Sequence, residues 1–422
     1  MSPLLSDELR LFKVRQSFDT QRLDDPAADV LDQVANADFM PDLAGKTVAI
    51  SAGSRGISNI AEIIKSIASG IRQRGGLPFI VPAMGSHGGG TAEGQVKVLA
   101  NYNITEEFCE CEIRASMDVI EVCQAKEGFP VYFDQKAAEA DYVVVCGRVK
   151  PHTDFTGPIQ SGLMKMMLIG LGKHEGAKVY HKAIKDYTFD QIVRSVAREV
   201  IDNCNVLCGV GIVENAYEET AHVEVVAPHA IESREEELLN MASEKMPKLP
   251  FDHADFLVID EIGKEISGAG LDTNIVGRKH YDHFPAPDEY PKIKRIAVRG
   301  LTEATHGNAT GIGMVEFCRT SVLEQMDVEM TRINCLTSGH VTAGMSPIDF
   351  PNDRQIIDEA LNTVGFCDAQ TAKMMWIKNT LHISELYCSE FFYEEAKKRN
   401  DLEILVEPRN MDFDAEGNLL PF

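Results

Sequence analysis

Short apolar runs alternate with amphipathic segments along the first half of the chain. Residues 47–52 are largely apolar, and after a glycine turn isoleucines recur every three or four residues, with Ser58 as the expected helix N-cap (Ile60, Ile63, Ile64, Ile67, Ile71). The first pattern is typical of a buried strand and the second of an amphipathic helix. Two further apolar runs, "LPFIVPAM" and "ADYVVVCG", lead into "GSHGGG" and "RVKPHTDFTGP", and Thr91 can cap the helix that follows "GSHGGG". Strands that alternate with amphipathic helices predict a mostly parallel α/β sheet.

The chain changes character between residues 234 and 254. The stretch "REEELLNMASEKMPKLPFDH" is charged and contains two prolines, and a new strand, "ADFLVIDEIG", follows it. The second half also shows an apolar run, "KIKRIAVRG", and an amphipathic helix, "DRQIIDEALNTV". We therefore predict two α/β domains with mostly parallel sheets, one over residues 1–248 and one over residues 249–401. The tail, residues 402–422, is predicted to return to the first sheet.

Length and charge narrow the classes of function. A chain of 422 residues is too long for one compact core. Its net charge of −24 argues against nucleic acid as a partner, because a phosphate backbone needs a basic face. No apolar run reaches the roughly 18 residues of a membrane span, and the first residues lack the pattern of a signal peptide. The ten cysteines are scattered, which favours buried, reduced thiols. We expect a cytoplasmic protein that binds neither nucleic acid nor membrane.

Three loops that follow predicted strands carry residues suited to chemistry. Parallel sheets bind ligands at the carboxyl ends of their strands, so Arg55, His87 and His152 are expected to converge on one site. An arginine before a helix suits a carboxylate or phosphate, although it could also be a surface residue in a turn. A histidine can act as a general acid or base near neutral pH, and a structural loop histidine is the alternative in both cases.

Lys165 lies in the run "LMKMMLI", where an unpaired ammonium is costly to bury. His181 follows on the far side of a glycine-rich break. His87, His152, His181 and Asp154 would also make a fair ligand set for zinc, so a metal-dependent hydrolase stays open, although no HExxH pair is present. His280, His283 and His306 lie in the second half, and the sequence does not decide between active-site and surface positions for them.

The ordered set of motifs resembles the nickel-dependent lactate racemase family. The matching residues are "AGSRG", "GSHGGG", "KPHTDFTG", Lys165, His181 and "GAGLDTN", over roughly residues 10–300. The resemblance implies two α/β domains with the active site in the cleft between them. It also implies a nickel pincer nucleotide, tethered through a thioamide to a lysine, with one histidine completing the square-planar nickel. The reaction implied is the racemisation or epimerisation of a 2-hydroxy acid by removal and return of a hydride.

The same resemblance assigns roles to residues of this chain. Lys165 matches the tether and His181 the nickel ligand. His87 and His152 match the two catalytic histidines, and Arg55 matches the arginine that binds the substrate. Further contacts to the cofactor are expected from Gly53, Ser54, Asp272 and Asn274. Small-molecule 2-hydroxy acids and the proteins that make and insert the cofactor are the expected partners, and protein made without that pathway would lack the cofactor.

Departures from the family fall mostly on the substrate side. The family's Asp-x-x-Arg is Ala-Gly-Ser-Arg here, and its Gly-Gly-x-Lys is Gly-Leu-Met-Lys, about three residues further from His152. Where the family has a lysine that holds the substrate, Arg278, Lys279 and His280 occupy the neighbourhood. We therefore expect a substrate other than lactate, with malate, an aryl-lactate and a sugar acid all open. A catalytically silent ligand-binding protein on the same scaffold is the other alternative.

Overall fold

The chain forms two compact units in a computed structural model that describes residues 5–422. The middle unit comprises Asp19–Met246. The terminal unit comprises the residues up to Phe18 together with Pro247–Phe422. Within residues 5–422, no helix is both long enough and apolar enough to cross a membrane. All ten cysteines are free thiols, and seven of them are buried.

The middle unit is built on a five-stranded sheet in the order β3-β2-β6-β7-β8. The strands β3, β2, β6 and β7 are parallel, and β8 is an antiparallel edge strand. Strands β2, β3 and β6 confirm the three apolar runs that were predicted as strands, whereas β7 and β8 were not predicted. Their bounds are β2 (Thr47–Ala52), β3 (Leu77–Pro82), β6 (Tyr142–Arg148), β7 (Val206–Glu214) and β8 (Thr220–Val226).

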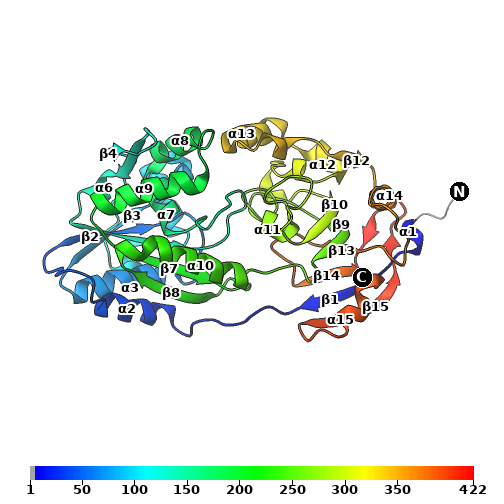
Figure 1. Cartoon of the computed structure of the whole chain (residues 1–422), viewed down its shortest axis with the longest axis horizontal. Coiled ribbons are helices and arrows are strands. Elements are labelled where there is room, and N and C mark those ends of the chain that lie inside the picture. Colours follow the sequence, from blue (N-terminus) through cyan, green and yellow to red (C-terminus); the bar gives the residue numbers. More distant parts are fainter. Residues whose placement is uncertain (1–4) are drawn as a thin grey trace. The chain divides into compact units, whose positions relative to one another are not determined.

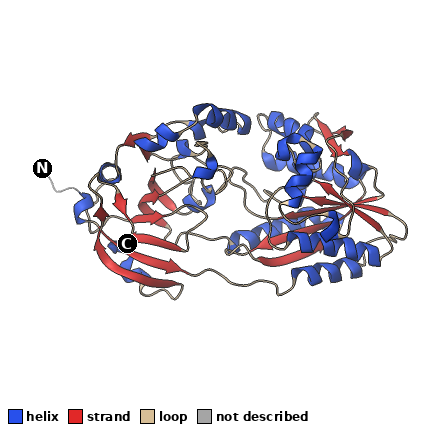
Figure 2. Ribbon diagram, turned by 180° about the vertical axis from the view of Figure 1, so that it is seen from behind, coloured by secondary structure: helices blue, strands red, loops and turns tan. Residues whose placement is uncertain are grey.

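Helices cover both faces of this sheet (Figure 2). Successive residues of a strand point to opposite faces, so Val48 and Ile50 pack against the helices α2 (Pro26–Asn36) and α3 (Ile60–Gln73), while Ala49 faces the core that contains α9 (Phe189–Asn203). Apolar residues on both faces are typical of a parallel sheet. The other elements of this unit are α4 (Ala92–Ala100), α5 (Glu106–Cys109), β4 (Val119–Gln124), β5 (Pro130–Asp134), α6 (Gln135–Ala138), α7 (Leu163–Lys165), α8 (Lys173–Ala183) and α10 (Ile231–Lys245).

One predicted helix cap is present and one is not. Thr91 accepts a hydrogen bond from the N–H of Gly94 at the start of α4, as predicted. Helix α3 instead has Asn59 at its N-cap, with a φ of 59° and no side-chain cap. The N–H of Ser58 is taken by Glu214, at 2.6 Å, so this residue fastens the loop after β2 to the end of β7.

The terminal unit holds an eight-stranded sheet in the order β12-β11-β10-β9-β13-β14-β1-β15. The strands from β12 to β13 run parallel, and β14, β1 and β15 add an antiparallel edge. The strands are β1 (Arg10–Gln16), β9 (His253–Ile259), β10 (Lys292–Val298), β11 (Phe317–Arg319), β12 (Ile348–Phe350), β13 (Met374–Ile377), β14 (Glu385–Ser389) and β15 (Leu402–Asn410), with a hairpin of β16 (Asp412–Phe413) and β17 (Leu419–Leu420). The helices are α1 (Leu5–Glu8), α11 (Thr273–Val276), α12 (Thr320–Gln325), α13 (Val328–Ser338), α14 (Asp353–Asn362) and α15 (Tyr393–Ala396) (Figure 1).

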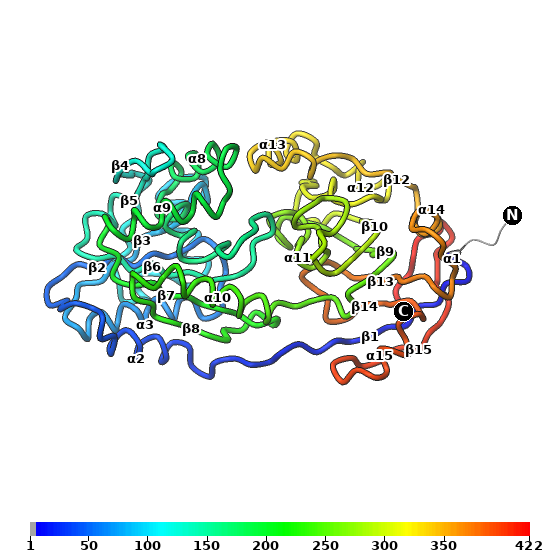
Figure 3. Tube along the Cα trace, in the orientation of Figure 1, coloured from blue at the N-terminus to red at the C-terminus, as the bar shows by residue number. Residues whose placement is uncertain are grey.

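The predicted return of the tail to the first sheet is wrong. Strand β15 pairs antiparallel with β1, and both belong to the sheet of the terminal unit, where the first and last parts of the trace run side by side (Figure 3). Arg15 forms ion pairs with Glu385 at 2.7 Å and with Glu403 at 3.0 Å on the neighbouring strands. The physical reason is that the partner of a strand is set by contacts across hundreds of residues, which a local pattern does not contain.

Candidate functional site

Three neighbouring strands of the middle unit end in the loops that carry the predicted site. Because β3, β2 and β6 are adjacent and parallel, their carboxyl ends lie at one edge of the sheet. The loop after β2 carries Arg55, the loop after β3 carries His87, and the loop after β6 carries His152. The positive charges of Arg55 and Lys165 both act on the imidazole of His87. The structure therefore brings His87, Arg55 and Lys165 together.

The loop that holds His87 depends on its glycines. Residues His87–Gly90 form a 3-10 turn in which Gly88, Gly89 and Gly90 have φ of 65°, 70° and 66°, a region that side chains disfavour. A Cβ at Gly88 would lie 2.4 Å from the carbonyl carbon of Gly94, so the backbone of α4 packs directly on the turn. Partial desolvation lowers the pKa of His87, and the charges of Arg55 and Lys165 lower it further. Both effects favour the neutral form of this imidazole.

The imidazole of His152 is fixed on several sides. Its Nδ1 accepts hydrogen bonds from the backbone N–H groups of Asp154, at 3.0 Å, and Phe155, at 3.3 Å. The N–H of His152 itself donates to Oε1 of Gln160 at 2.8 Å. The imidazole stacks on the ring of Phe155, with centroids 3.8 Å apart and an angle of 7°, and the ring of Phe155 stacks on Phe189 at the same distance.

Lys165 ends α7 and is followed by a π-helical turn, Met166–Gly170, before α8 begins. Its side chain is half-buried, and its Nζ lies 5.2 Å from the centroid of the Phe155 ring. Among the described residues, its ammonium has no ion pair. Burial lowers the pKa of Lys165 to about 8, Arg55 and Lys150 lower it as well, and Asp154 opposes them. An amine with this pKa is partly neutral near pH 7 and can act as a nucleophile.

A buried carboxylate holds the start of the Lys165 segment. Glu235 on α10 is fully buried, and its Oε2 accepts the N–H of Met164 at 2.8 Å. A Cβ on Gly162 would lie 2.3 Å from Oε1 of Glu235, so only glycine fits before α7. Burial raises the pKa of Glu235 to about 7. Sequence patterns did not reveal this contact, because Glu235 stands in a charged run and its partner is 71 residues away.

A second buried charge fixes the start of α8. Lys173 is fully buried and forms an ion pair with Asp134, Nζ to Oδ2, at 2.9 Å. Its ammonium also donates to the carbonyl of Pro82 and, at 3.3 Å, to Oε1 of Gln95. The amide of Gln95 donates to the carbonyls of Met84 and Gly85, at 3.0 and 3.1 Å. This network ties the loop of His87 to the helix that carries His181.

Gly53 and Ser54 shape the end of β2. A Cβ at Gly53 would lie 3.4 Å from Cε of Met166, so this position leaves room for the residue that follows Lys165. The carbonyl of Ser54 accepts a hydrogen bond from the hydroxyl of Tyr102 at 3.3 Å.

His181 lies in the last turn of α8 with its side chain exposed. Its ring centroid is 5.2 Å from that of Tyr180, and partial desolvation lowers the pKa of its imidazole. Within residues 5–422, no group of three or more His, Cys, Asp or Glu side chains could hold a metal ion. The alternative zinc set of His87, His152, His181 and Asp154 is therefore not assembled. The exposed imidazole of His181 could bind a metal whose other ligands come from a cofactor.

The predicted residues of the terminal unit form a local chain of hydrogen bonds. Both the backbone N–H and the side-chain amide of Asn274 donate to Oδ1 of Asp272 at 2.9 Å, and Nζ of Lys279 donates to Oδ1 of Asn274 at 3.0 Å. Asp272 is the N-cap of α11. His280 is exposed, with its Nδ1 3.5 Å from Glu289.

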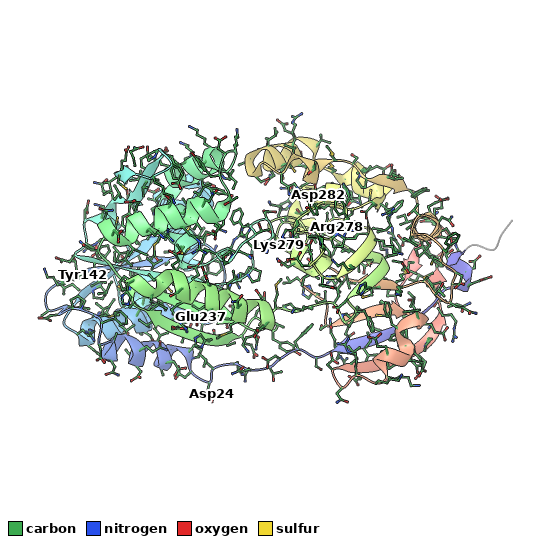
Figure 4. The ribbon with its side chains drawn as sticks, in the orientation of Figure 1. Asp24, Tyr142, Glu237, Arg278, Lys279 and Asp282 are labelled. Carbon is green, nitrogen blue, oxygen red and sulfur yellow. The ribbon has the colours of Figure 1, made fainter. Side chains whose placement is uncertain are left out.

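Arg278 does not face a ligand in this unit. Its side chain is only 1% exposed, and its guanidinium donates to the carbonyl of Ile293 at 2.9 Å and lies 3.7 Å from Glu316. Burial lowers the pKa of Arg278. Figure 4 labels Arg278 beside Lys279 in the terminal unit. These contacts favour a structural role for Arg278 over the predicted contact with substrate.

Comparison with known families gives a match within the middle unit. Residues 45–190 match the model of the lactate racemase N-terminal domain. This part of the chain is similar to a lactate racemase N-terminal domain. This match confirms the resemblance seen in the motifs, and it spans every predicted site residue of the middle unit.

Two solved structures share the fold of the lactate racemase-like chain. The lactate racemase apoprotein from Thermoanaerobacterium thermosaccharolyticum is 15% identical over 93% of this chain and 86% of that chain, with a TM-score of 0.51. A protein from Thermotoga maritima is 12% identical over 76% of this chain and 84% of that chain, with a TM-score of 0.50. These likenesses show the mixed α/β fold with mostly parallel sheets. No curated protein matches the sequence.

Proposed function

We propose that this protein is an isomerase that inverts a stereocentre of a 2-hydroxy acid other than lactate, with a nickel pincer nucleotide tethered to Lys165. The observation that carries the proposal is the state of that lysine. It is half-buried, lies within the lactate racemase domain, and its pKa is lowered to about 8 beside Arg55. The family match supports racemase chemistry in general. The proposal of a tethered cofactor depends on Lys165.

The residues of the middle unit fit such a cofactor. Acylation of the Lys165 amine would remove the charge that burial disfavours. The ring of Phe155 lies next to Nζ and adds an apolar wall, although its two faces are already stacked on His152 and Phe189. His181 supplies one imidazole, and soft sulfur ligands from the cofactor with one imidazole suit square-planar Ni(II). When bound, the cofactor supplies an acceptor and donor of hydride.

The charged and titratable residues of the site then bind the substrate and transfer its proton. In this proposal, Arg55 binds the substrate carboxylate through its planar guanidinium. As the Cα–H bond breaks and the hydrogen leaves with both electrons, the hydroxyl loses its proton and becomes a carbonyl. His87, whose lowered pKa favours the neutral imidazole, takes that proton in this proposal. Return of the hydride to the other face of the keto acid, and of the proton to oxygen, completes the inversion.

The site differs from that of a lactate enzyme on the substrate side. Ala52 stands where the family has aspartate, and Arg278, in the neighbourhood of the family's substrate lysine, is buried. Of the predicted cations there, Lys279 and His280 remain candidates for substrate contact. The ten free thiols support a reducing compartment, and we place the protein in the cytoplasm together with the proteins that supply its cofactor.

The direct test uses protein produced in cells that also make the pincer nucleotide. Loaded protein is incubated with single enantiomers of lactate, malate, an aryl-lactate and a sugar acid, and the products are separated by chiral chromatography. We expect inversion of at least one acid other than lactate, and none with the Lys165→Ala variant. Inversion of lactate in preference to all the others, or none at all by loaded protein, would contradict the proposal.

A further inference from the structure

The imidazole of His152 has its proton on a defined nitrogen. In a neutral imidazole one nitrogen is a donor and the other an acceptor. Nδ1 of His152 accepts from two backbone N–H groups, those of Asp154 and Phe155, at 3.0 and 3.3 Å. The ring proton is therefore on Nε2. Protonation of Nδ1 would place its hydrogen against the hydrogens of these two N–H groups, which is unfavourable.

The loop gives the ring no easy alternative. A half-turn of the imidazole would place a C–H group against both N–H donors. The backbone of His152 is held as well, because its N–H donates to Oε1 of Gln160 at 2.8 Å and the side-chain amide of Gln160 donates to the carbonyl of Gly157 at 3.0 Å. Phe155 is stacked between the imidazole and Phe189, so the ring plane is fixed as well. The acceptor role of Nδ1 is thus built into the backbone.

His87 is held differently. No hydrogen bond to either ring nitrogen of His87 is found in the described part of the chain, and its side chain is exposed at the turn. It can take up and release a proton at a ring nitrogen without breaking a contact that shapes its loop. The two histidines at this edge of the sheet are therefore not equivalent.

From this difference we infer that His152 acts as a neutral hydrogen-bond donor through Nε2–H, and that His87 carries the proton in both directions of the reaction. The inference about the reaction rests on the proposed function, whereas the state of the imidazole does not. In the oxidation of the hydroxy acid, the hydroxyl proton would move to His87, and the hydride would leave Cα with its electron pair for the acceptor that the cofactor tethered to Lys165 supplies when bound. The oxygen that becomes a carbonyl can then accept a hydrogen bond from Nε2–H of His152, which stabilises the charge that develops on it.

The state of His152 can be measured directly by nitrogen NMR on the full-length protein. Histidines are labelled with 15N, and the His152→Gln spectrum identifies the resonances of His152 by their loss. We expect Nε2 to be protonated and Nδ1 to be unprotonated between pH 7 and pH 8. A proton on Nδ1, or rapid exchange between the two nitrogens, would overturn the inference. This measurement needs neither cofactor nor activity, so its outcome is independent of the proposed function.

Two replacements of His152, made in protein that carries the cofactor, distinguish a hydrogen-bond donor at Nε2 from a group that transfers a proton. The amide nitrogen of His152→Gln reaches the place of Nε2 and keeps a donor there. The side chain of His152→Asn is the matched control, because its oxygen can still accept the two backbone N–H groups, whereas its shorter amide places no donor at the position of Nε2. We expect His152→Gln to keep kcat within about tenfold of the parent and His152→Asn to lose about 10²–10³-fold, as for a removed oxyanion donor. His87→Gln should lose about 10²–10⁴-fold.

Equal loss of kcat in His152→Gln and His87→Gln would overturn the donor role. If the loaded parent turns over no 2-hydroxy acid, the proposed function fails, and the NMR result still decides the state of the imidazole.

Discussion

Lys165 and Lys173 stand eight residues apart in one apolar stretch, and their surroundings are opposite. Lys173 is fully buried, and Asp134, Gln95 and the carbonyl of Pro82 satisfy its ammonium. Lys165 is half-buried, without an ion pair in the described part of the chain, and its pKa is lowered to about 8. A lysine that stabilises a fold is paired, and a lysine kept for chemistry is left partly neutral. Lys173 therefore positions the segment on which Lys165 can react.

Loss of the Lys165 amine should have the largest effect. Lys165→Ala is expected to abolish inversion of the substrate in protein made with the cofactor pathway, because no other amine takes its place. Lys178→Ala is the matched control, since Lys178 is exposed and its Nζ pairs with Glu175 at 2.7 Å. Chiral chromatography of the products measures both. Activity that survives in Lys165→Ala and disappears in Lys178→Ala would move the tether to Lys178.

Loss of the Lys173 ammonium should act on stability. Lys173→Met leaves the carboxylate of Asp134 buried without its partner, which costs about 3–5 kcal/mol of unfolding free energy. Lys178→Met removes only an exposed pair and should stay within about 0.5 kcal/mol of the parent. Urea denaturation followed by circular dichroism measures the difference. Equal effects of the two substitutions would show that the buried pair does not anchor α8.

Glu235 should make stability depend on pH. Its folded pKa is raised from 4.5 to about 7, so the folded protein binds more protons than the unfolded chain between these values, and its stability falls as pH rises through them. Glu235→Gln cannot ionise. Its unfolding free energy relative to the parent should therefore increase by up to about 3 kcal/mol between pH 5 and pH 8. A difference that is the same at both pH values would mean that Glu235 is not buried as a titrating group.

Substitution by methionine should raise the free energy of unfolding at Lys165, whereas at Lys173 it lowers it. The folded pKa of Lys165, about 8, lies below its usual 10.5, so its burial costs stability below pH 8 and the cost is relieved as pH rises toward 10.5. Lys165→Met should therefore stabilise the protein at pH 7 by about 1 kcal/mol, after allowance for the exposed part of the side chain. Repeating the urea titrations at pH 7 and pH 10 should show the gain and then its disappearance. Destabilisation at pH 7 would indicate a structural lysine like Lys173.

The sequence was sufficient where the deciding contacts are local. The spacing of apolar residues predicts the strand over residues 47–52 and the helix that follows it. The motifs at the ends of the strands led to Arg55, His87 and His152. It was insufficient where the partner is distant. The pairing of β1 with β15, the contact of Glu235 with Met164 and the burial of Arg278 each depend on residues brought together by the fold. For the same reason, the apolar run did not show which of its lysines is paired with Asp134.

The most direct test of the central claim is mass spectrometry of protein produced together with the pincer-nucleotide pathway. The intact mass and the peptides of the digest are compared with those of protein produced without it. We predict an adduct the size of a mononucleotide derivative, several hundred daltons, on the peptide that contains Lys165, with Lys173 unmodified. Protein of unmodified mass under these conditions, or an adduct on any lysine other than Lys165, would contradict the account.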